Sequence, residues 1–115
     1  MAVLSDNLRS TGKVFSALTD DTEVAVASKP CLIDSIHVLN ETGADAYLQL
    51  FNALLADVTI GTTAPTLVVG VSPNDVQSIT FRKPIRFNIG LVVGSTTERA
   101  GSSAALMESI IIYAD

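Results

Sequence analysis

The feature that most constrains this chain is a series of short apolar segments, separated by turn-forming residues at intervals of roughly ten residues. Most segments alternate apolar with polar residues, which is the period-two pattern of a strand with one buried face. Clusters of Asp, Asn, Ser, Gly and Pro stand between them and are typical of turns. The pattern predicts an all-β fold, a sandwich or a barrel. The candidate strands are residues 13–18, 22–28, 31–39, 44–51, 58–60, 66–71, 76–81, 85–93 and 104–113.

The alternation also selects a candidate core, made of apolar residues on the face of each strand that we expect to point inward. These residues are Val24, Val26, Ile36, Val38, Leu48, Leu50, Ile79, Phe81, Phe87, Ile89, Leu91, Ile110 and Ile112. Residues 94–103, rich in Ser, Thr and Gly, are predicted to form a loop. Residues 53–57, with the leucines before them, are the one helical alternative. We expect less than about 15% helix, because Tyr47 and Phe51 fit a strand equally well.

Length and composition indicate one folded domain. The chain has 115 residues, of which 48% are hydrophobic, which is enough to build a core and too much for a disordered chain. The first eleven residues are mixed and polar and follow neither period, so residues 1–11 are predicted to be an arm, free or docked on a neighbour. Residues 12–115 are predicted to form a single β-sandwich domain.

The net charge and the targeting signals limit the kinds of partner that we expect for this chain. The net charge of −5 argues against a nucleic-acid partner, because such affinity comes largely from clustered Lys and Arg. The chain does not begin with a basic region followed by an apolar run, and no apolar run approaches the roughly 20 residues that cross a bilayer. Cys31 is the only cysteine and cannot form an intramolecular disulfide. We therefore expect synthesis in a reducing cytoplasm and no membrane partner.

Few residues could carry catalysis. His37 is the only histidine, and Asp34, three positions away, would project from the opposite face of a strand. His37 thus lacks the orienting carboxylate and the nucleophile that a general base needs. Cys31 is better explained as a small buried apolar residue than as a nucleophile. The carboxylates lack calcium-loop spacing, and one Cys with one His is too few for structural zinc, so we expect no enzyme, no cofactor and no metal.

This acidic chain contains one compact basic cluster, formed by Arg82, Lys83 and Arg86. The cluster is explained equally well as a charged turn between two strands and as a contact for an acidic protein surface. On the second interpretation, Arg99 in the loop 94–103 could join it.

The second half of the chain resembles the capsid cement, or decoration, proteins of tailed bacteriophages. The resemblance rests on the order Ile79-Thr80-Phe81, a break at Lys83-Pro84, the alternating run 85–93, a Ser/Thr/Gly loop and the final strand Ser109-Ile110-Ile111-Ile112-Tyr113. It covers residues 12–115 in the expected architecture, and about residues 76–115 in the kinds of residue that make up successive segments. The resemblance implies a jelly-roll-like antiparallel sandwich and a non-enzymatic virion protein. Such a protein binds the outer capsid surface and stabilises the shell by bridging major capsid subunits.

Two sets of residues are hypothesised to make the contacts of such a protein. Tyr47 and Phe51 lie opposite the presumed core face of their strand and would form an exposed apolar patch, which a soluble monomer rarely tolerates. We expect this patch to bury against another copy in a dimer or a trimer, and the resemblance favours the trimer. The surface that faces the major capsid protein is assigned to Val3, Leu4 and Leu8 in the arm and to Arg82, Lys83, Arg86 and Arg99.

The main alternative is a knob domain of a phage fibre or tail tip that binds a receptor or a glycan. Glycan sites use exposed aromatic rings, so an aromatic content of 5% without Trp argues against this alternative. A small hydrolase or isomerase on a β scaffold is a third possibility, and the sequence offers it no acid–base pair.

Overall fold

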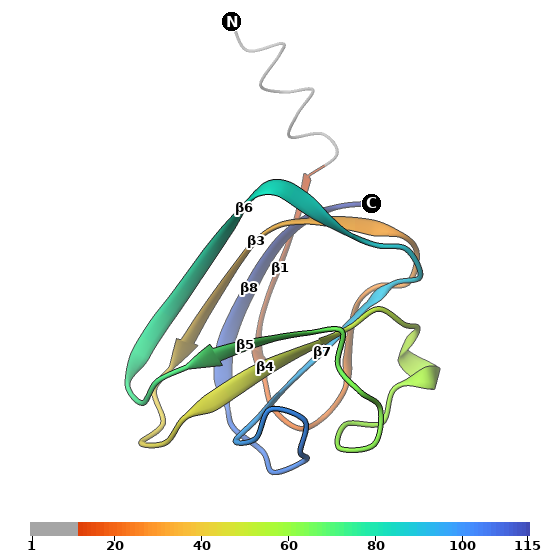
Figure 1. The fold of residues 1–115 in the computed structure, drawn as a ribbon. Coiled ribbons are helices and arrows are strands. Elements are labelled where there is room, and N and C mark those ends of the chain that lie inside the picture. The colour runs from red at the N-terminus through yellow and green to blue at the C-terminus, as the bar shows by residue number, and fades with distance from the viewer. Residues whose placement is uncertain (1–11) are drawn as a thin grey trace, which may run out of the picture.

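Two antiparallel β-sheets of four strands each pack face to face in the computed structural model, which describes residues 12–115 (Figure 1). Among these residues the only helical element is a 3-10 turn, η1 (Leu55–Asp57). The prediction of an all-β sandwich is therefore confirmed. The predicted arm, with Val3, Leu4 and Leu8, lies outside the described residues. The strands are β1 (Gly12–Thr19), β2 (Val24–Ala27), β3 (Cys31–Asn40), β4 (Ala46–Phe51), β5 (Leu67–Val71), β6 (Asp75–Phe87), β7 (Leu91–Thr96) and β8 (Met107–Ala114).

The strand order defines a jelly roll. Sheet A has the order β1-β8-β3-β6, and sheet B has the order β2-β7-β4-β5. The first strand pairs with the last, the second with the seventh, the third with the sixth and the fourth with the fifth. This is the pairing of one long hairpin rolled into two sheets, the double-sheet architecture of jelly rolls.

The core lies between the sheets and contains much of the set predicted from alternation. Six of the predicted residues are buried, and four more are partly buried and pack on them. The buried six are Ile36, Val38, Leu48, Leu50, Phe87 and Leu91, and the partly buried four are Val24, Val26, Ile79 and Phe81.

The prediction was wrong for the last strand, which is shifted by one residue. In β8, Ile111 and Tyr113 point into the core, whereas Ile110 and Ile112 point away from it. The run of three isoleucines is apolar on both faces, so its alternation does not identify the inner face. A shift of one residue exchanges every side chain between the two faces of a strand.

Several predicted boundaries also differ from the structure. The segment 85–93 is divided between β6 and β7 by a turn, which leaves Ile89 49% exposed instead of in the core. The predicted loop 94–103 begins later, because β7 continues to Thr96. Pro84 does not end a strand but lies within β6, an edge strand where a missing N–H is tolerated. The predicted strand 58–60 is part of a loop.

Two buried polar residues connect the sheets. Thr19, at the end of β1 in sheet A, contacts the hydroxyl of Ser95 in sheet B and lies 2.8 Å from the Ser109 hydroxyl. Asn40, at the end of β3, donates hydrogen bonds from Nδ2 to the carbonyls of Val71 and Ser72 at the end of β5, both at 3.1 Å. Because buried polar groups need partners, these bonds fix how the two sheets meet.

Candidate interaction surfaces

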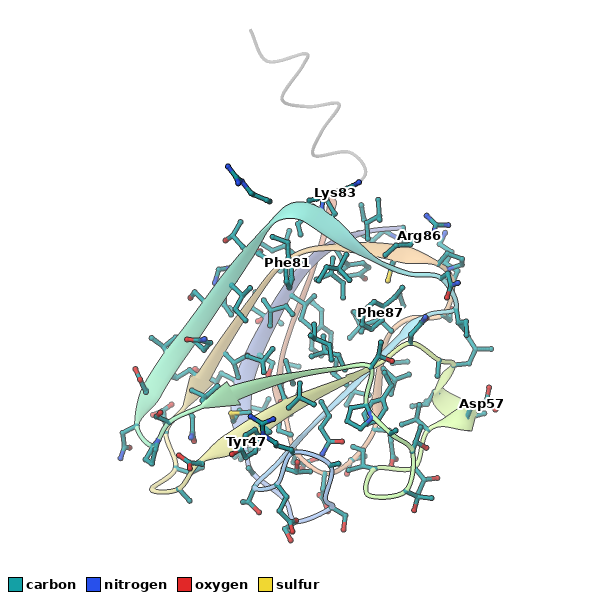
Figure 2. All side chains as sticks on the ribbon, in the orientation of Figure 1. Tyr47, Asp57, Phe81, Lys83, Arg86 and Phe87 are labelled. Carbon is teal, nitrogen blue, oxygen red and sulfur yellow. The ribbon has the colours of Figure 1, made fainter. Side chains whose placement is uncertain are left out.

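One end of sheet A collects most of the basic residues. In register, Ala114 of β8 pairs with Gly12 of β1 and with Leu32 of β3, and Leu32 pairs with Arg86 of β6. The starts of β1 and β3, the end of β8 and the last part of β6 therefore lie together, and Figure 2 shows Lys83 and Arg86 at this end. We call it the basic end. It holds five of the seven Lys and Arg residues of the chain: Lys13, Lys29, Arg82, Lys83 and Arg86.

A bend in β6 presents Lys83. Between two register pairs, Ile33 with Ile85 and Ser35 with Thr80, β3 advances two residues while β6 advances five. The extra residues 81–84 bow away from β3 as a bulge, and Figure 2 shows Lys83 at its apex. Arg82, Lys83 and Pro84 are all exposed there. The basic cluster is thus part of an irregular sheet edge, which also discourages strand pairing along β6.

One ion pair lies at the basic end. The Nζ atom of Lys13 is 2.8 Å from a carboxylate oxygen of Asp115. Their hydrogen bond raises the pKa of Lys13 and lowers the pKa of Asp115, since each charge favours the other. Lys13 is therefore neutralised locally, and the free positive charge at this end comes mainly from β6.

A shallow pocket beside Arg86 contains the only cysteine. It is lined by Pro30, Cys31, Leu32, Arg86, Ala114 and Asp115. Burial raises the pKa of the Cys31 thiol, so the thiol is protonated at neutral pH and is a weak nucleophile. That Cys31 and His37 perform no chemistry stays a prediction.

Arg99 does not join the basic cluster. Its guanidinium carbon lies 5.8 Å from the centroid of the Tyr47 ring, over the ring. Tyr47 is near the start of β4 in sheet B, and Figure 2 shows it at the opposite end of the molecule from Lys83. The sequence prediction that Arg99 shares a surface with Lys83 is therefore wrong, because the connection after β7 folds back over sheet B.

Phe51 and Tyr47 do not form the expected exposed patch. The side chain of Phe51 is 1% exposed, because Val58 and Ile60 of the connection between β4 and β5 pack over it. The ring of Tyr47 is half-buried and packs against Gly70 of β5. The outer face of sheet B is thus covered by loops of its own chain, and the assignment of Phe51 to self-association is wrong.

Sequence reasoning missed the apolar surface that the described residues do leave open. On the outer face of sheet A, side chains from all four strands alternate with the core residues. Of the nine exposed large apolar side chains among residues 12–115, five lie on this face: Val14, Leu18, Leu32, Val76 and Ile110. Val14 is 66% exposed and Leu18 is 60% exposed. The sequence did contain one signal for this surface: the run of three isoleucines in the final strand, which places apolar side chains on both faces of that strand.

His37 lies at the centre of this outer face. Its register partners are Ile110 of β8 and Ser78 of β6, and its Nδ1 atom is 3.1 Å from the Ser78 hydroxyl. Among residues 12–115, no three His, Cys, Asp or Glu side chains group as they would to hold a metal ion. No helix in the same part of the chain has the length and apolarity to span a membrane.

Comparisons with known proteins give distant likenesses. No protein-family model and no curated protein matches the chain. Solved structures that it resembles include a pilus protein of Bacillus endospore appendages, with a TM-score of 0.45 and 13% identity over 90% of this chain and 88% of that one. The coat protein dimer of tobacco streak virus has a TM-score of 0.44 and 9% identity over 92% and 87%.

A virus-like particle of the extra small virus of the prawn Macrobrachium rosenbergii has a TM-score of 0.31 and 8% identity over 89% of this chain and 79% of that one. Likenesses at these TM-scores and identities establish neither a family nor a function.

Proposed function

We propose that this protein is a structural virion component of the capsid-cement class. It docks on the outer surface of a shell and stabilises it by bridging major capsid subunits. The observation that carries the proposal is the basic end, where an acidic chain with a net charge of −5 gathers five of its seven cations. A local field opposite in sign to the global one suits docking on an acidic protein surface.

The geometry of the basic end supports a docking role in two further ways. Arg82 and Lys83 project from the bend in β6, outside the regular hydrogen-bonded part of the sheet. The segment 1–11 joins the domain at Gly12, which lies at this same end. The basic cluster would orient the protein on the shell, and the segment would add contact area through Val3, Leu4 and Leu8.

The alternative of a glycan-binding knob finds less support. An aromatic platform for a sugar would have to come from Tyr47, which lines a shallow pocket with Asp45, Gly70 and Ser72. That ring already packs against Gly70 and lies under the Arg99 guanidinium. The tyrosine is therefore engaged by its own chain.

Binding to undecorated shells tests the docking surface. The double variant Arg82→Ala/Lys83→Ala should bind shells of its virus's major capsid protein roughly three- to thirtyfold more weakly than the wild type at low salt, since each rim charge is worth up to about 1 kcal/mol. The difference should shrink as salt rises, because screening weakens exposed charges first. Binding would be measured by co-sedimentation across a salt series.

Arg99→Ala is the matched control for this experiment, because it removes one cation at the opposite end, and it should bind like the wild type. A chain lacking residues 1–11 should also bind more weakly, with little change in salt dependence. Equal binding by the double variant and the wild type at every salt concentration would place the contact elsewhere. Retention of the wild type on nucleic acid, with none on shells, would contradict the proposed class.

A further inference from the structure

The outer face of sheet A is uncharged in the middle, where apolar side chains of β1 and β8 lie beside small polar ones, and charged at its ends. Its central rows across the four strands, read from the register, contain no charged side chain. One row is Ser16, Ile110, His37 and Ser78, and the next is Val14, Ile112, Ser35 and Thr80.

The two ends of the same sheet carry opposite charge. The basic end has five cations against two carboxylates, Asp34 and Asp115. At the other end β1 runs into a turn, β3 ends, β6 begins and β8 begins, as Figure 1 shows. We call it the acidic end. Its carboxylates include Asp20, Asp21, Glu41, Asp75 and Glu108, while Arg99 lies over Tyr47 on sheet B.

We propose that the outer face of sheet A binds the same face of a second copy of this chain, about a twofold axis that lies in the interface and runs across the strands. A twofold axis along the strands would place like-charged ends over each other. An axis across the strands places the basic end of each copy over the acidic end of the other. Charge complementarity therefore identifies both the occupant, a second copy, and its antiparallel orientation.

The size of the face suits a modest but specific interface. Four strands spaced about 4.8 Å apart and about eight residues long, with every second side chain on this face, cover roughly 500 Å² per copy, or about 1,000 Å² for the pair. This is near the lower limit of specific interfaces, so association should be sought up to high protein concentration. A shallow hollow bounded by Ser16, Leu18, Glu108 and Ile110 offers a place for an apolar side chain of the partner.

Sedimentation of the full chain, free of shells, tests this interface. The wild type should be a dimer at tens of micromolar, and Val14→Glu and Ile110→Glu should each shift it to monomer by at least tenfold in dissociation constant. Both positions are exposed, so the domain should stay folded by circular dichroism. Leu55→Glu is the matched control, since Leu55 is also exposed but lies in η1, in the connection between two strands of sheet B, and this variant should remain dimeric.

Salt dependence tests the orientation. If the basic end of each copy lies over the acidic end of the other, the dimer should weaken as sodium chloride rises from low to moderate concentration, because salt screens the attraction. If like-charged ends lay over each other, the dimer should strengthen, because salt would screen the repulsion. A monomeric wild type, dimers that survive Val14→Glu and Ile110→Glu, or strengthening with salt would each overturn the proposal. The partner's acidic end and an acidic shell surface would both draw on the cations of the basic end, so the dimer is measured without shells and its failure is distinguishable from a failure of shell docking.

Discussion

Replacing Phe87 with alanine is expected to lower the free energy of unfolding by about 3–5 kcal/mol, the range for removing a buried aromatic ring. Phe87 is 1% exposed, ends β6 opposite Cys31, and lies between the sheets in Figure 2. Its ring fills the core at the basic end, and the close packing of interiors leaves no neighbour free to fill the gap. Chemical denaturation followed by circular dichroism would measure the loss.

Ile89→Ala is the matched control for this substitution. Ile89 is two residues further along the chain but is 49% exposed in the turn before β7. Its replacement should cost less than about 1 kcal/mol, as for surface substitutions in general. Similar losses for the two variants would show that the chain does not divide into two strands between residues 87 and 91.

Asn40→Ala should be the second most damaging substitution, with a loss of about 2–4 kcal/mol, because it removes a fully buried side chain that donates to three carbonyls, of which the bond to Val71 is buried. The Nδ2 atom of Asn40 donates to the carbonyls of Ala44, Val71 and Ser72, and its Oδ1 atom accepts from the backbone and the hydroxyl of Thr42. Asn40 is fully buried. Loss of this side chain therefore loosens the turn after β3 and its contact with the end of β5.

The variant Asn40→Asp distinguishes the hydrogen-bonding role of this side chain from its role in filling space. Aspartate has the same outline but cannot donate to the three carbonyls, and it would bury a charge facing them. It should cost at least as much as alanine at neutral pH, and its deficit should decrease as the pH falls and the carboxyl becomes protonated. If the aspartate variant were as stable as the wild type at neutral pH, Asn40 would have only a steric role.

The sequence was sufficient to predict strands wherever alternation was unambiguous. In β3, buried Ile36 and Val38 alternate with the half-buried His37 and Leu39, so the inner face could be identified directly. In β8 the three consecutive isoleucines satisfy either face, and only pairing with β1 and β3 fixes which one is buried. The division of 85–93 was hidden because Ile89 continues the alternation through a turn.

The surfaces were harder to predict than the strands, because they depend on where loops fold. Arg82, Lys83 and Arg86 are close in sequence, so their cluster was visible, but Lys13 and Lys29 join it only through the sheet register. The connections after β4 and β7 cover sheet B, which hides Phe51 and engages Arg99. Period-two patterns do not contain this information, and so the apolar face was expected on the wrong sheet.

The number of copies of this chain in purified virions tests the central proposal most directly. A cement protein binds at repeated positions of the shell, so quantitative mass spectrometry should find on the order of hundreds of copies per particle, on the outside and accessible to protease. Shells stripped of the protein should also break at lower temperature than decorated ones. A handful of copies per particle would indicate a fibre or tail-tip component, and absence from the virion would contradict the proposed function.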